Sequence, residues 1–326
     1  NGPLLIIDGA GTGKTTVITR RISWLIKEKL ARTEEILALT FTEKAAAEME
    51  ERVDILVPYG YIDTWISTFH AFGDRVLREN YLELGISGTY EILTKSDQMI
   101  FLKNHLFEFP LQYFRPLSNP MKHIDALIGF ISRCKDELIS PQDYLDYAQQ
   151  LSTKAKTDED KLNTNKHFEL GQFYEYYQEL LIKQGKFDFG DLIIKTIELF
   201  NSRPDILSRY QQQFKYILVD EFQDTNYAQN ELIKLLAKKN NNITVVGDDD
   251  QSIYKFRGAA ISNILDFTKY FPKTKTIVLN ENYRSTQQIL DSAYKLIKHN
   301  NPDRLEVKNK INKKLITNKK GDAPQI

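Results

Sequence analysis

The sequence has only one cysteine, Cys134, among its 326 residues. A single thiol excludes an internal disulfide framework and is typical of proteins that work in a reducing compartment. The sequence also lacks any run that approaches the ~20 apolar residues of a membrane-spanning helix. No signal-peptide pattern, with a basic start and a small-residue cleavage site, is visible. We therefore expect no membrane segment and a cytoplasmic location.

The chain has no net charge, since 44 Lys and Arg residues balance 44 Asp and Glu residues. A surface that is basic over its whole area is thereby excluded, so any contact with nucleic acid must come from local placement of charge. Apolar residues at 41% and charged residues at 27% are ordinary for globular proteins. At this length two or three compact units are expected. An apolar run starts at Leu4, so we expect the chain to begin inside a domain.

Short apolar runs rich in β-branched residues recur along the chain and end in Gly, Asp, Thr or Ser. They cover residues 4–7, 36–40, 216–219, 243–246 and 276–279. Such runs are typical of buried parallel strands. Amphipathic helical patterns lie between them, for example at 15–30 and 42–53. The alternation predicts an α/β fold, with a parallel sheet flanked by helices and ligands at the carboxyl ends of the strands.

Residues 83–186 differ from the rest, with long polar and aromatic stretches and no clear strand run. We interpret them as a helical insertion into a discontinuous α/β domain formed by residues 1–82 and 187–280. Residues 281–326 follow this domain, and their Lys-rich part at 300–320 has two readings. It is either a solvated surface or a patch that contacts DNA.

The first strand run leads into the segment DGAGTGKTT at 8–16 and then into a helical pattern, which is the context of a phosphate-binding loop. Its glycines allow tight turns that aim backbone N–H groups at a phosphate, at the positive end of a helix. Lys14 would reach the β- and γ-phosphates, and the Thr15 hydroxyl would coordinate Mg²⁺. Asp8 stands where the usual pattern has Gly or Ala, so we expect it to tilt the loop or lower affinity. The residues expected to cradle the nucleotide are Gly9, Ala10, Gly11, Thr12, Gly13, Lys14, Thr15 and Thr16.

The strand run at 216–219 ends in two adjacent carboxylates, Asp220 and Glu221. Adjacent residues of a strand point to opposite sides, so the two acids can have different roles. Asp220 would contact Mg²⁺, and Glu221 would orient and deprotonate the water that attacks the γ-phosphate. Together with the loop at 8–16, this pair predicts an enzyme that hydrolyses a nucleoside triphosphate.

A third strand run, 243–246, ends in the segment GDDDQSIYKFRGA at 247–259. This segment and DEFQDTN at 220–226 resemble motifs III and II of the UvrD/Rep/PcrA-type superfamily 1 DNA helicases. Other segments resemble further motifs of the same family, with agreement in order and spacing as far as Thr286. They are 8–16 for motif I, 39–49 for motif Ia, 67–72 for motif Ib, 187–192 for a neighbouring family segment and 282–286 for motif IV.

The resemblance implies a RecA-like P-loop NTPase, in which residues 1–82 and 187–280 form domain 1A, 83–186 form helical domain 1B and 281–326 start domain 2A. It implies an enzyme, an ATP-dependent helicase that moves 3′ to 5′ along single-stranded DNA and separates strands in DNA repair or replication. The implied cofactors are ATP and Mg²⁺, the implied partners are single-stranded DNA and duplex junctions, and we expect a monomer. Motifs V and VI would lie beyond Ile326, so we expect this chain to bind ATP but to turn it over poorly.

The resemblance also implies roles for single side chains. Gln251 would lie between the γ-phosphate and DNA and sense hydrolysis. Arg257 and Arg284 would approach the γ-phosphate, where guanidinium groups neutralise developing charge, and Tyr283 would stack on the adenine. Unpaired bases would stack on aromatic side chains. The residues expected to contact DNA are Phe41, Thr68, Phe69, His70, Tyr254 and Phe256.

Two positions depart from the family pattern. Phe256 stands where the family commonly has Trp, which predicts a smaller stacking platform, and Glu43 stands where motif Ia often has Asn, which removes one polar contact with DNA. Phe41 and Phe69 have an alternative reading as core residues. Three other functions stay open: the motor of an AddA/RecB-type helicase-nuclease, a clamp that binds single-stranded DNA with little ATPase activity, and a P-loop ATPase unrelated to DNA.

Overall fold

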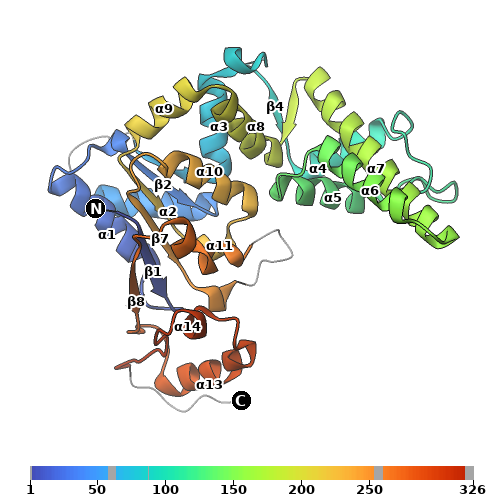
Figure 1. The fold of residues 1–326 in the computed structure, drawn as a ribbon. Helices are drawn as coiled ribbons and strands as arrows, with labels where there is room; N and C mark the ends of the chain where they lie inside the picture. The colour runs from blue at the N-terminus through green and yellow to red at the C-terminus, as the bar shows by residue number, and fades with distance from the viewer. Residues whose placement is uncertain (1, 58–63, 87, 253–259, 320–326) are drawn as a thin grey trace. The chain divides into compact units, whose positions relative to one another are not determined.

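The computed structural model describes most of the chain (Figure 1). The described residues are 2–57, 64–86, 88–252 and 260–319. No helix in these stretches is both long enough and apolar enough to cross a membrane.

The chain forms two compact units. One consists of Asn1–Phe72 and Phe200–Ile326, and the other of Gly73–Leu199. The first unit is therefore discontinuous in sequence. Both boundaries fall within helices, α3 (Phe69–Glu79) and α8 (Phe189–Ser202). The assignment to domains 1A, 1B and 2A stays a prediction.

A parallel six-stranded sheet forms the centre of the first unit, with the strand order β3-β2-β6-β7-β1-β8. Its strands are β1 (Leu4–Asp8), β2 (Ile36–Thr40), β3 (Trp65–Thr68), β6 (Tyr216–Val219), β7 (Ile243–Gly247) and β8 (Lys275–Leu279). The predicted α/β fold with a parallel sheet is confirmed. Because all strands run the same way, the loops that follow β1, β6 and β7 emerge at one edge of the sheet.

Helices connect these strands in the first unit, and α13 and α14 follow the last strand. They are α1 (Lys14–Lys27), α2 (Glu43–Leu56), α9 (Pro204–Gln213), α10 (Tyr227–Ala237), α11 (Ser262–Leu265), α12 (Phe267–Tyr270), α13 (Gln287–Ile297) and α14 (Leu305–Lys308). The apolar stripe of α1 buries Ile18 and Ile22, and that of α2 buries Met49 and Val53, in one cluster with residues of β1, β2, β6 and β7. This packing fixes where α1 begins, directly after the phosphate-binding loop. The Thr42 side chain caps α2 by accepting a hydrogen bond from the Ala45 N–H at 3.1 Å.

The second unit contains α4 (Lys95–Asn104), α5 (Ile124–Asp136), α6 (Pro141–Lys154) and α7 (Asp158–Lys183) around an apolar core. The reading of residues 83–186 as free of strands is wrong, because β4 (Glu91–Leu93) pairs in parallel with β5 (Lys186–Asp188). Three charged groups are buried beside this pair. The Lys135 ammonium lies 2.7 Å from carboxylate oxygens of both Asp188 and Asp191. A buried charge is tolerated only when it is paired, so this cluster fixes the start of α8 on α5.

Candidate functional site

The loop between β1 and α1 has the backbone of a phosphate cradle. Gly11 and Gly13 have φ values of 80° and 98°, in the left-handed region that glycine adopts without strain. A Cβ atom at Gly11 would lie 2.7 Å from the Arg284 side chain, so glycine is also required there by close approach. The Thr12 hydroxyl closes the loop by donating to the Gly9 carbonyl at 2.9 Å. The N–H groups of the first turn of α1, which find no acceptor within the helix, are therefore suited to bind a phosphate at the loop.

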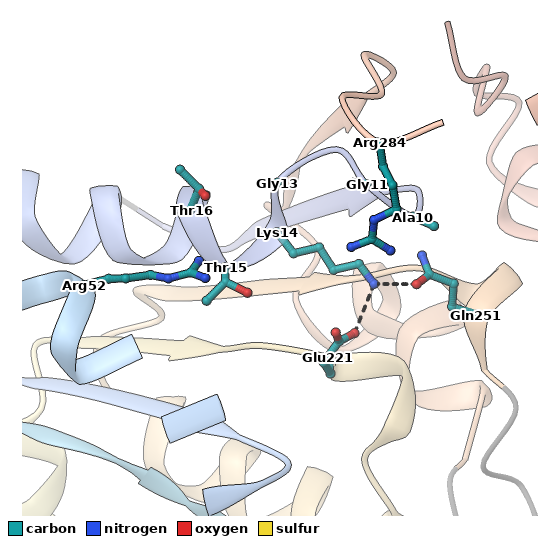
Figure 2. A pocket seen from close by; sticks show the side chains of 10 residues that line it. All are labelled: Ala10, Gly11, Gly13, Lys14, Thr15, Thr16, Arg52, Glu221, Gln251 and Arg284. Carbon is teal, nitrogen blue, oxygen red and sulfur yellow. Dashed lines mark hydrogen bonds and ion pairs between the residues drawn. The ribbon is translucent and has the colours of Figure 1, made fainter. Parts of the chain in front are cut away.

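A pocket of about 300 Å³ opens beside this loop (Figure 2). Its walls come from α1, α2 and the loops that follow β6, β7 and β8, so distant parts of the sequence meet here. The lining residues are Ala10, Gly11, Gly13, Lys14, Thr15, Thr16, Arg52, Glu221, Gln251 and Arg284. Of the residues predicted to bind or hydrolyse the nucleotide, the structure therefore brings the loop, Lys14, Glu221, Gln251 and Arg284 together.

Lys14 is the cation at the centre of the pocket. Its ammonium lies 3.1 Å from a carboxylate oxygen of Glu221 and donates to the side-chain oxygen of Gln251 at 2.9 Å (Figure 2). Burial alone would lower the pKa of Lys14, but attraction to Asp8 and Glu221 outweighs burial and raises it. Lys14 is thus charged at neutral pH and is held between two acceptors that a phosphate could replace.

Asp220 and Glu221 both lie past the end of β6, so strand alternation does not separate them as the sequence suggested. Glu221 instead has a left-handed φ of 48°, which turns its side chain toward Lys14. The Glu221 carboxylate also accepts a hydrogen bond from the Gln223 amide at 2.7 Å. Asp220 is 3% exposed, and burial, followed by repulsion from Glu221, raises its pKa to about 6. The buried Asp220 thus suits a metal ligand, and Glu221, which lines the pocket, suits a general base.

The turn after β8 carries Tyr283 and Arg284 and is tied to the phosphate-binding loop by Asn282. The buried Asn282 side chain donates to the Ala10 carbonyl and accepts from the backbone N–H of Arg284 at 2.9 Å. The Tyr283 N–H donates to the Gly11 carbonyl at 3.0 Å. Arg284 lines the pocket, whereas Tyr283 is 66% exposed.

Sequence reasoning assigned no role to Asn282 or to Arg52. Arg52 extends from α2 into the pocket (Figure 2). It directly precedes Val53 of the buried stripe of α2, so its place at the margin of that stripe was a signal that could have been used. Asn282 was visible within motif IV, but its pairing with Ala10 is a tertiary contact.

The residues predicted to contact DNA divide into several environments. Thr68 is buried, and its hydroxyl donates to the Glu43 carboxylate at 2.7 Å. Phe69 is 2% exposed and belongs to the core, whereas Phe41 and His70 are partly buried. Burial lowers the pKa of His70, against the opposing effect of Glu43. Tyr254, Phe256 and Arg257 lie outside the described residues.

Asp8 is fully buried at the end of β1, where the usual motif has Gly or Ala. One carboxylate oxygen accepts a hydrogen bond from the Thr12 hydroxyl at 3.3 Å, and the other has no partner among the described residues. Burial raises the pKa of Asp8 to about 8, against attraction to Lys14 and with repulsion from Asp248, Asp220 and Glu221. Asp8 is therefore mostly protonated at neutral pH in the nucleotide-free protein.

Asp8→Asn should remove a pH dependence of stability. The folded chain retains the Asp8 proton up to about pH 8, whereas the unfolded chain releases it near the ordinary pKa of 3.8. Between these two pH values the folded state therefore binds more protons than the unfolded state. The free energy of unfolding should consequently fall as the pH rises from the lower value to the higher one. Urea unfolding at about pH 5 and about pH 8 measures the difference. Asp8→Asn should lose the part of this pH dependence that comes from Asp8. The control Asp54→Asn, at an exposed site, should keep it. Equal slopes in both variants would contradict the assignment.

Comparisons with known proteins agree with the geometry. A family model described as the UvrD/REP helicase N-terminal domain matches residues 1–272. The chain is 43% identical over 302 residues to the ATP-dependent DNA helicase PcrA of Bacillus subtilis, which covers 92% of this chain and 38% of that protein. It is 42% identical over 326 residues to the ATP-dependent DNA helicase PcrA of Leuconostoc citreum, with 98% and 40% covered. The chain thus spans about two fifths of the length of these curated relatives.

Proposed function

This chain belongs to the UvrD/REP helicase family, and on that premise we propose that it forms the nucleotide-hydrolysing part of an ATP-dependent DNA helicase. One observation carries the proposal. Lys14, Glu221 and Gln251, from three segments far apart in sequence, meet in one pocket beside a phosphate-binding loop. Such a set of a cation, a base and an amide is what phosphoryl transfer to water requires.

The residues around the pocket fit ATP with Mg²⁺. Backbone N–H groups of the loop and of the start of α1 would hold the phosphates, and the Thr15 hydroxyl and the Asp220 carboxylate would hold the metal. Bound Mg²⁺ would neutralise charge that develops on the β- and γ-phosphates. Arg52, from α2, and Arg284, from the turn after β8, line the same pocket and would add cationic donors. Tyr283 would stack on the adenine.

The hydrogen bonds of Lys14 suggest how the base becomes available. Without nucleotide, the Glu221 carboxylate is occupied by the Lys14 ammonium at 3.1 Å. A γ-phosphate competes for the same ammonium, because it carries more negative charge than one carboxylate. Glu221 would then be free to accept a proton from the attacking water, and Gln251 would lie beside the phosphate.

We propose that the full-length protein moves 3′ to 5′ along single-stranded DNA and separates strands at duplex junctions, in DNA repair or replication. The resemblance of its motifs and the names of its relatives support this. Phe41, Thr68 and His70 lie at the carboxyl ends of β2 and β3 and would face the strand, together with Tyr254 and Phe256. The proposal includes a cytoplasmic, monomeric protein, with 1–82 and 187–280 as domain 1A, 83–186 as domain 1B and 281–326 as the start of domain 2A.

The rate of ATP hydrolysis by the full-length protein, with and without single-stranded DNA, tests the proposal. Single-stranded oligonucleotides should raise the rate severalfold, and blunt duplexes without a single-stranded tail should do so much less. Hydrolysis that ignores DNA would overturn the motor function and leave an ATPase. Absence of hydrolysis under both conditions would overturn the whole proposal.

A further inference from the structure

An acidic cluster follows β7 and directly precedes Gln251. The carboxylates of Asp248, Asp249 and Asp250 lie within 4.8 Å of one another. The ammonium of Lys313 lies among them, 2.6 Å from Asp248 and 2.8 Å from Asp250, and it also contacts Asp249. The Lys313 side chain is only 4% exposed. Neither sequence reading of the Lys-rich stretch fits Lys313, which is neither solvated nor placed to contact DNA.

A second cation holds the same cluster from the same stretch of chain. The Arg304 guanidinium pairs with both carboxylate oxygens of Asp250, at 2.7 and 2.6 Å, and lies 2.7 Å from Glu306. The backbone N–H of Leu305 donates to Asp249 at 2.8 Å. Residues 304–313 are therefore bound to the end of β7 by several charged contacts, each of which is shielded from water.

The cluster is connected to the nucleotide site by a chain of three hydrogen bonds. Lys313 donates to one carboxylate oxygen of Asp248 at 2.6 Å, and the Gln251 amide N–H donates to the other at 2.7 Å. The Gln251 oxygen in turn accepts from Lys14 at 2.9 Å. An ionised carboxylate can only accept hydrogen bonds, so Asp248 fixes which end of the Gln251 amide points toward Lys14.

We propose that Lys313 is a positioning residue for nucleotide hydrolysis, acting through Asp248 to orient the side-chain amide of Gln251. The inference rests on the function proposed above and adds a residue to its machinery. It also makes the stretch 304–313 part of the element that senses the γ-phosphate, since a change at Gln251 is transmitted to Lys313 through a single carboxylate.

The charge balance explains why a lysine is needed at this position. Burial alone would lower the pKa of Lys313, but attraction to the three aspartates outweighs burial and raises it. Without this cation, the three carboxylates would repel one another, and Asp248 would turn away from its position beside Gln251. With Asp248 turned away, the Gln251 amide N–H would lose its acceptor, so the amide could reverse and present its N–H groups to Lys14.

Lys313→Met in the full-length protein tests the inference, with Lys314→Met as the matched control. Lys314 is the next residue, but its side chain is 50% exposed and pairs at 3.4 Å with Asp291, which lies outside the acidic cluster. Lys313→Met should lower kcat for ATP by about 10- to 100-fold, as loss of a supporting partner does at other sites. The affinity for a fluorescent ATP analogue should change little, and Lys314→Met should match the wild type. Equal kcat in the two variants would overturn the inference.

A purely structural role predicts a different pattern, which a double-mutant cycle detects. In a Gln251→Ala background, Lys313→Met should change kcat by less than about twofold, because its effect passes through Gln251. If Lys313→Met does not fold, Asp249→Ala combined with Lys313→Met removes one negative charge with the positive charge and keeps the test available. An undiminished effect in the Gln251→Ala background would overturn the inference. A wild-type protein without ATP hydrolysis would overturn the proposed function itself.

Discussion

Glu221→Gln should lower ATP turnover by the full-length protein by about 10²–10⁴-fold, the usual range for the loss of a general base. Gln has the same shape, and its side-chain oxygen can still accept from Lys14 and Gln223. ATP binding should therefore stay close to that of the wild type. Because chemistry becomes slow while binding persists, the variant should accumulate bound, unhydrolysed ATP.

Single-turnover hydrolysis and equilibrium binding of a fluorescent ATP analogue separate the two effects on Glu221→Gln. Glu28→Gln is a suitable control, since Glu28 is exposed and lies at the far end of α1. Single-stranded DNA should stimulate ATP hydrolysis by Glu28→Gln but should not restore hydrolysis by Glu221→Gln. Normal single-turnover hydrolysis by Glu221→Gln would show that another group accepts the proton, and the left-handed backbone at Glu221 would then need a different explanation.

The sheet of the first unit was largely predictable because most of its strands are buried apolar runs, although β8 is exposed or only half-buried. The runs at 243–246 and 276–279 correspond within one residue to β7 (Ile243–Gly247) and β8 (Lys275–Leu279). β3 (Trp65–Thr68) was missed, because only its first two residues are strongly apolar. β4 and β5 have three residues each, too few to show a period, and they are stabilised by contacts that the sequence does not display.

Convergence of the loop, Glu221 and Gln251 was predictable, because the carboxyl ends of parallel strands share one edge. The individual pairings were not. Lys313 and Lys314 are neighbours of the same type in a Lys-rich stretch, yet one is buried among aspartates and the other is half exposed. Only the fold of residues 304–313 onto β7 distinguishes them. Asn282 likewise acquires its role from the approach of β8 to β1, which local sequence does not specify.

Lys14→Ala should lower ATP hydrolysis by the full-length protein by about 10³-fold, near the upper end of what one donor contributes to a charged transition state. ATP binding should weaken as well, unlike in Glu221→Gln, because Lys14 would contact the phosphates in the ground state too. Steady-state hydrolysis with saturating single-stranded DNA, together with binding of the fluorescent analogue, measures both effects. Lys27→Ala, at the exposed last turn of the same helix, should match the wild type.

Loss of Lys14 should also act on the nucleotide-free protein, because its ammonium is the cation that attracts both Asp8 and Glu221. Without it, an ionised Asp8 is more costly, so the pH at which Asp8 releases its proton should rise further. The stability of Lys14→Ala should therefore fall below that of the wild type near pH 8, and Asp8→Asn should recover part of the loss. Hydrolysis close to normal in Lys14→Ala, with no such recovery, would mean that the γ-phosphate does not lie where Lys14, Glu221 and Gln251 meet.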